Sequence, residues 1–141
     1  VGGYRASIGY AIYGSTKFAV EAITEALHYE LASLGIQATA VEPGYFRTDF
    51  LDSSSVVEAK KRIADYDETA GKTRERARAV NHQQPGDPEK LARALIKIVE
   101  SNNAPLRIQF GSDAIQAVEN KNAFVQQELN TWRELSTSTD F

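Results

Sequence analysis

A tyrosine and a lysine, Tyr13 and Lys17, stand four residues apart in the stretch AIYGSTKFAV. A tyrosine phenol has a pKa of about 10, so at neutral pH it is a poor proton acceptor unless its phenolate is stabilised. Residues four apart in a helix project from the same face, and an ammonium held there favours the phenolate. Such a pair could exchange a proton with a substrate oxygen.

The spacing alone is weak evidence. Roughly 0.3 Tyr-x-x-x-Lys pairs are expected by chance from the numbers of tyrosines and lysines in this chain. None of the other tyrosines has a lysine four residues later. The alternative interpretation is a tyrosine packed at a helix start beside an exposed lysine, so the surrounding sequence has to decide.

Composition narrows the classes of function. The 141 residues carry a net charge of −3, which argues against a surface for nucleic acids or anionic membranes. There is no cysteine, and His28 and His82 lie too far apart in sequence for an obvious zinc site, so we expect no metal centre. No apolar run approaches the ~18 residues of a membrane span, and no signal peptide is visible. We expect a cytoplasmic enzyme or binding module.

The pair lies at the start of a predicted helix over residues 13–34, preceded by a loop over residues 1–12. Gly35 follows the helix, where a left-handed residue usually closes one. The apolar residues that step by three and four form one stripe along this helix: Val20, Ile23, Leu27, Leu31 and Leu34. We expect apolar surface of the helix to stay exposed without the missing half of the fold.

A buried strand is predicted next, over residues 36–41, because this segment is short, nearly uncharged and β-branched at both ends. Pro43 and Gly44 end it, since proline cannot donate to a strand ladder and glycine permits a tight turn. The polar segment 49–84 predicts one or two short surface helices with mobile connections.

The rest of the chain alternates in the same way. A helix over residues 87–101 is predicted with Asp87 as its N-cap, then a strand over 106–111 and a helix over about 112–135. The apolar face expected for the first of these helices comprises Leu91, Leu95, Ile98 and Val99. This order is typical of an α/β protein with a parallel sheet. Two strands cannot form a sheet that helices cover on both faces, so further strands must come from outside these residues.

In this order the residues resemble the short-chain dehydrogenases/reductases in their compact, one-domain form. YGSTKFAVEAITEALHYELASLGIQATAVEPGYFRT is similar to the family's catalytic helix, sixth strand and proline–glycine turn, and GDPEKLARALIKIVES and PLRIQFGSDA resemble its next helix and last strand. The resemblance covers essentially all 141 residues. It implies the carboxyl-terminal part of a Rossmann-like doubly wound parallel sheet with flanking helices. Residues 1–141 would form a single partial domain, with 49–84 as the substrate lid.

The resemblance also implies the site. Tyr13 and Lys17 would be the catalytic pair, and Lys17 would also hold the nicotinamide ribose of NAD or NADP. The cofactor-binding set that it implies is Tyr13, Lys17, Pro43, Gly44, Tyr45, Phe46 and Thr48. Thr48 could instead be an ordinary helix N-cap, and both roles are compatible.

Three aromatic residues after the strand, Tyr45, Phe46 and Phe50, are candidates for a substrate wall, with core packing as the alternative. The implied activity is hydride transfer between a nicotinamide cofactor and a small-molecule secondary alcohol or carbonyl. A non-catalytic structural or regulatory relative is one alternative. An epimerase or dehydratase is another, although that branch usually carries a larger carboxyl-terminal domain.

Several of the family's features do not occur in this chain. The glycine-rich nucleotide turn, the residue that selects NAD or NADP and the assisting asparagine are absent, and the catalytic serine should lie immediately upstream of Val1, because Ser7 is too close to Tyr13. We therefore expect the carboxyl half of such an enzyme, inactive alone, whose partner is the amino-terminal half of the same fold. We also expect a homodimer or homotetramer that uses the outward face of residues 15–34.

Overall fold

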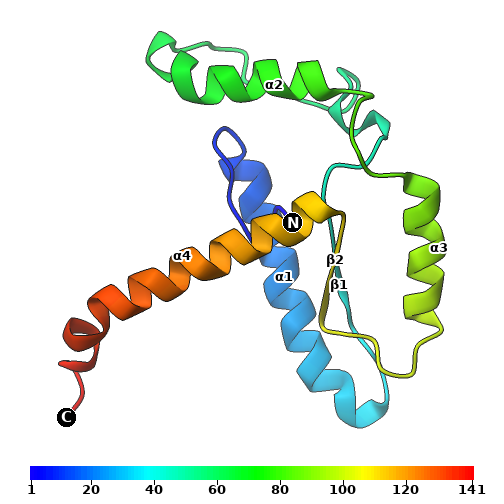
Figure 1. Ribbon diagram of the computed structural model, residues 1–141, viewed down its shortest axis with the longest axis vertical. Helices are drawn as coiled ribbons and strands as arrows, with labels where there is room; N and C mark the ends of the chain where they lie inside the picture. The colour runs from blue at the N-terminus through cyan, green and yellow to red at the C-terminus, as the bar shows by residue number, and fades with distance from the viewer.

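The computed structural model describes residues 1–141 as two parallel strands surrounded by helices (Figure 1). The main elements in chain order are α1 (Ala11–Leu31), β1 (Ala40–Pro43), α2 (Lys72–Val80), α3 (Pro88–Val99), β2 (Arg107–Phe110) and α4 (Ser112–Thr137). Short helical turns lie between them: η1 (Ala32–Leu34), η2 (Asp49–Leu51), η3 (Ala64–Tyr66) and the π-type turn η4 (Asp67–Gly71).

The two strands pair in parallel, from Ala40 opposite Arg107 to Pro43 opposite Phe110. A parallel pair needs a long crossover connection, and α3 lies within it. In Figure 1, α3 lies on one side of the strand pair, and α1 and α4 lie on the other. The α/β order and the parallel sheet predicted from the sequence are confirmed.

The first strand begins at Ala40 rather than residue 36 and extends to Pro43, so its predicted bounds were wrong. The residues before Ala40 use side chains where a strand would use its backbone. The Gln37 side chain donates to the carbonyl of Asn102 (3.0 Å) and accepts from the N–H of Ala104 (2.9 Å), and Thr39 Oγ1 donates to the Pro105 carbonyl. These bonds hold the residues before Ala40 beside the residues that lead into β2, without the backbone hydrogen bonds of a strand pair.

The first helix turns its predicted apolar face away from the sheet. Val20 and Ile23 are 52% and 60% exposed, and Leu27 and Leu34 are exposed as well; only Leu31 is half-buried. The face toward the strands carries Glu21, Glu25 and His28 instead, and His28 Nδ1 lies 3.1 Å from the carbonyl oxygen of Ala38. Periodicity identified this apolar stripe, and most of its side chains stay exposed within the chain.

The other helices follow their local signals. Gly35 has a φ of 71° and closes η1, as expected of a left-handed cap. The Asp87 carboxylate accepts from the N–H groups of Glu89 and Lys90 at 2.9 and 3.1 Å, which confirms the N-cap of α3. Val99, however, is 84% exposed, so it does not belong to the inner face of that helix.

The segment 49–84 folds as η2, η3, η4 and α2, and α2 lies across one end of the molecule (Figure 1). Its two ends are held together: Asp52 Oδ1 accepts from Asn81 Nδ2 (2.5 Å) and pairs with His82 Nε2 (3.0 Å). A parallel β-bridge between Phe46 and Gly86, which flank this segment, also holds its two ends together.

Little of the chain is shielded on all sides. Eight residues are fully buried, and the apolar ones are Ala40, Leu51, Ala114 and Ala117. Large apolar side chains on α1 and on the second half of α4, among them Trp132, stay exposed. None of the helices is long and apolar enough to cross a bilayer.

Candidate active site

The first two turns of α1 carry the tyrosine and the lysine. Lys17 Nζ lies 5.4 Å from the centre of the Tyr13 ring, within the range of a cation–π contact. Tyr13 is 40% exposed, and Lys17 makes no ion pair within the chain. The structure therefore brings the two residues together and leaves the ammonium free to bind another group.

The opening residues lie against the same turn of the helix. A Cβ built on Gly3 would lie 2.5 Å from the carbonyl oxygen of Lys17 and 2.7 Å from Cγ of Glu21, closer than real Cβ contacts come. A Cβ on Gly2 would lie 3.2 Å from the Tyr13 ring. Only glycine fits at position 3, a constraint that the sequence analysis did not identify.

Two aromatic rings lie close to that of Tyr13. The ring centre of Tyr10 lies 6.1 Å away in an edge-on arrangement, and that of Phe50 lies 5.8 Å away. Phe50 is about half exposed, so its ring has a free face beside the Tyr13 phenol. Tyr10, which the sequence analysis did not single out, belongs to the same group.

Both phenols in this group are held in the protonated form. Burial raises the pKa of Tyr13, and it also raises the pKa of Tyr10, which the neighbouring phenols of Tyr45 and Tyr13 raise further. The direction for Tyr13 is opposite to the lowering that a nearby ammonium favours. In this chain, desolvation is the cause of the shift.

The turn after β1 is fixed by the first turn of α4. The N–H of Gly44 donates to the Phe110 carbonyl (2.8 Å), and the N–H of Tyr45 donates to Asp113 Oδ2 (2.7 Å). The carboxylate of Asp113 also lies over Gly44, where a Cβ would overlap it. Asp113 is thus a site residue that the sequence analysis did not identify; it lies within the helix predicted over about 112–135.

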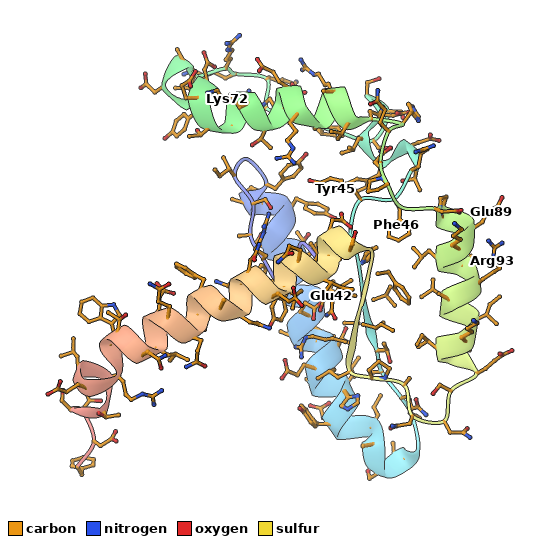
Figure 2. The ribbon with its side chains drawn as sticks, in the orientation of Figure 1. Glu42, Tyr45, Phe46, Lys72, Glu89 and Arg93 are labelled. Carbon is orange, nitrogen blue, oxygen red and sulfur yellow. The ribbon has the colours of Figure 1, made fainter.

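Two of the implied cofactor-binding residues differ in whether their backbone N–H is available to a ligand. The N–H of Tyr45 already has a partner, whereas the N–H of Phe46 makes no hydrogen bond within the chain. Figure 2 shows Tyr45 and Phe46 near the first turn of α4. The Phe46 ring packs on Gly86, where a Cβ would lie 2.7 Å from it, so packing accounts for this ring.

Thr48 is the N-cap of η2, with Oγ1 accepting from the N–H of Phe50 at 3.4 Å. The N-cap interpretation therefore holds, and this cap positions the ring that faces Tyr13.

Three potential metal ligands lie where the two ends of the segment 49–84 meet. Side-chain atoms of Asp49, Asp52 and His82 lie within 4.8 Å of one another. The Asp52–His82 ion pair already explains their proximity.

The family model described as short chain dehydrogenase matches residues 1–59. The oxidoreductase BOA17 of Botryotinia fuckeliana is 32% identical over 139 residues, which is 99% of this chain and 50% of that protein. A 3-ketodihydrosphingosine reductase of Bacteroides thetaiotaomicron is 32% identical over 113 residues, 79% of this chain and 41% of the relative.

A crystal structure of a short-chain dehydrogenase from Streptomyces avermitilis superposes with a TM-score of 0.87 at 35% identity, covering 99% of this chain and 50% of that one. The chain thus spans about half the length of the relatives it matches. The likeness confirms the expected Rossmann-like α/β fold. The matched family model, the identity along nearly the whole chain and the shared fold show that this chain belongs to the short-chain dehydrogenase family.

Proposed function

We propose that this protein is an NAD- or NADP-dependent oxidoreductase that interconverts a secondary alcohol and a carbonyl. The observation that carries the proposal is the placement of Tyr13 and a free Lys17 ammonium on one turn of α1, next to the Phe50 ring. The names of the relatives, an oxidoreductase, a reductase and a dehydrogenase, agree with this class of reaction.

The residues around the turn after β1 suit a nicotinamide cofactor. The Asp113 carboxylate occupies the side of Gly44 where a side chain would be and holds the turn in place, and the unpaired N–H of Phe46 can donate to a carboxamide oxygen. The free Lys17 ammonium can donate to ribose hydroxyls. We assign these contacts to the cofactor, with Pro43 and Thr48 shaping the turn.

In this proposal the cofactor supplies or accepts the hydride, and Tyr13 handles the proton. The Tyr13 phenol donates its proton to the carbonyl oxygen during reduction and accepts the hydroxyl proton during oxidation. Because burial raises the pKa of Tyr13, the phenol is protonated at neutral pH and ready to act as the donor. Lys17 stabilises the phenolate that remains once the proton has left.

The surroundings of Tyr13 favour an uncharged, apolar substrate. Tyr10 and Phe50 form the walls on either side of the phenol. The nearest carboxylate that acts on Tyr10, Glu58, is bound by Arg78 at 2.7 and 2.9 Å, so its charge is compensated. The segment 49–84 would cover this region as a lid, since a Cβ on Gly9 would lie 3.6 Å from Ala70 and Thr73.

The test is substitution of Tyr13 by Phe in the natural protein. We expect turnover of carbonyl substrates to fall at least a thousandfold (roughly the general acid/base contribution), with the cofactor dissociation constant nearly unchanged. Lys17→Ala should impair both turnover and cofactor binding. Tyr29→Phe, on the exposed side of the same helix, is the matched control and should change neither. Normal turnover by the Tyr13→Phe variant would show that Tyr13 is not the proton donor.

A further inference from the structure

The most deeply buried charged side chain of the chain lies immediately before the turn that we assign to the cofactor. Glu42, on β1, is 1% exposed, and neither of its carboxylate oxygens has a hydrogen bond of good geometry, although the Gln109 amide lies close enough to favour the charged form. Figure 2 shows it where α4 crosses α1. Burying a carboxylate without partners is costly, so its presence one residue before Pro43 calls for a compensating role.

A single guanidinium on the neighbouring strand links Glu42 to the first helix. Arg107 Nε lies 3.9 Å from Glu42 Oε1 and 3.0 Å from Glu21 Oε2, and the guanidinium also binds the carboxylate of Glu25. These four side chains form the charge cluster. Because one guanidinium interacts with three carboxylates, the attraction between Glu42 and Arg107 competes with the attraction between Arg107 and the two carboxylates of α1, Glu21 and Glu25.

The charge cluster links α1 to the strands. The apolar residues of the helix point away from the sheet, and Glu21 and Glu25 take their place on the inner face. Glu21 lies one helical turn beyond Lys17, so a shift of Arg107 moves the part of the helix that bears the catalytic pair. The same guanidinium reaches Glu42, which is covalently one residue from the Pro43–Gly44 turn.

We propose that Glu42 is a positioning residue: through Arg107 it holds the turn of α1 that bears Tyr13 and Lys17 in register with the Pro43–Gly44 turn. The proposal rests on the proposed function for its effect on turnover. It does not need Glu42 to touch substrate or cofactor.

The charge state of Glu42 gives the proposal a measurable signature. Burial raises the pKa of Glu42, and the Glu21 carboxylate raises it further, while the Gln109 amide and the Arg107 guanidinium oppose this. A pKa raised by folding stabilises the protein at low pH, and this stability is lost as pH rises through the raised value. Ionised Glu42 thus destabilises the fold at neutral pH and is the form that attracts Arg107.

The experiment is Glu42→Gln in the natural protein, which keeps the shape and removes the charge. Turnover should fall about tenfold while the substrate KM stays within about twofold, because only alignment is lost. The thermal midpoint should stay equal or rise, since an unpaired buried charge has gone. Wild-type turnover should approach that of the variant as pH falls through the raised pKa of Glu42, and the variant should lack this step.

A second readout does not depend on activity. Hydrogen exchange at residues 13–21 should be faster in the Glu42→Gln variant than in the wild type at neutral pH, and the two should converge in acid. Glu30→Gln, an exposed change on the same helix, is the control and should leave exchange and turnover unchanged.

The outcomes separate this proposal from the proposed function. If the wild type reduces no carbonyl compound, the proposed function fails, yet faster exchange in the Glu42→Gln variant would still support the positioning role. A variant with wild-type turnover, pH profile and exchange overturns that role. A lower thermal midpoint with unchanged turnover overturns it as well, because it shows that Glu42 only stabilises the fold.

Discussion

Replacing Gly44 by Ala tests whether the turn after β1 depends on close contact with α4. The added Cβ would come within less than 3.0 Å of three atoms of the Asp113 carboxylate, a separation that real Cβ atoms do not tolerate. Gly44 does not need a left-handed backbone, so strain in φ contributes nothing. The whole effect therefore passes through Asp113, whose carboxylate must move away.

The magnitude follows from the bond that this movement breaks. Asp113 Oδ2 accepts from the N–H of Tyr45 at 2.7 Å, a hydrogen bond to a charged group. Bonds of this kind contribute about 1.5–3 kcal/mol, so we expect Gly44→Ala to lower the free energy of unfolding by about 2 kcal/mol. Cofactor affinity should fall as well, because the Phe46 N–H moves with the turn.

The assay is urea denaturation of the natural protein in a double-mutant cycle with Asp113→Ala. Once the carboxylate is gone, Gly44→Ala should cost less than about 0.5 kcal/mol, since the overlapping atoms are absent. Gly71→Ala is the matched control: its Cβ would meet Asp67 Cβ at 3.5 Å, Asp67 Oδ1 at 3.6 Å and the Tyr66 carbonyl oxygen at 3.7 Å, all ordinary contacts. An equal cost of Gly44→Ala with and without Asp113 would refute the reasoning.

Two further predictions concern the lid and the outer face of α1. Gly86→Ala should lower the thermal midpoint and raise the substrate KM, because its Cβ would lie 2.7 Å from the Phe46 ring and 2.8 Å from the Tyr45 carbonyl oxygen; unchanged values of both would contradict this. The apolar face of α1 that includes Val20 and Ile23 predicts that the natural protein forms a dimer or tetramer through this helix, and sedimentation as a monomer at micromolar concentration would count against it.

Structural features that depend only on neighbouring residues in the sequence could be predicted. The N-cap at Asp87, the left-handed Gly35 and the pairing of Tyr13 with Lys17 each depend on residues within one or two turns of the chain. The parallel order of strands followed from the alternation of elements. The family resemblance then supplied the roles that no local pattern contains.

Contacts between distant residues could not be predicted. Asp113 reaches back 68 positions to Tyr45, and Arg107 reaches back 86 positions to Glu21, so neither contact has a local signature. Which face of α1 lies toward the strands could not be predicted for a related reason. Its apolar stripe and its acidic stripe both repeat at helical spacing, and only the position of Arg107 on β2 shows which of them faces the strands.

The two stripes of α1 have different roles: one positions the site and the other contributes to stability. The acidic stripe, through Glu21 and Arg107, fixes where Tyr13 and Lys17 stand relative to the turn after β1. The apolar stripe, from Val20 to Leu34, is free to bury against other residues and to contribute stability there. Substitutions on the acidic stripe should therefore change turnover more than stability. Polar substitutions on the apolar stripe should instead change assembly or stability first.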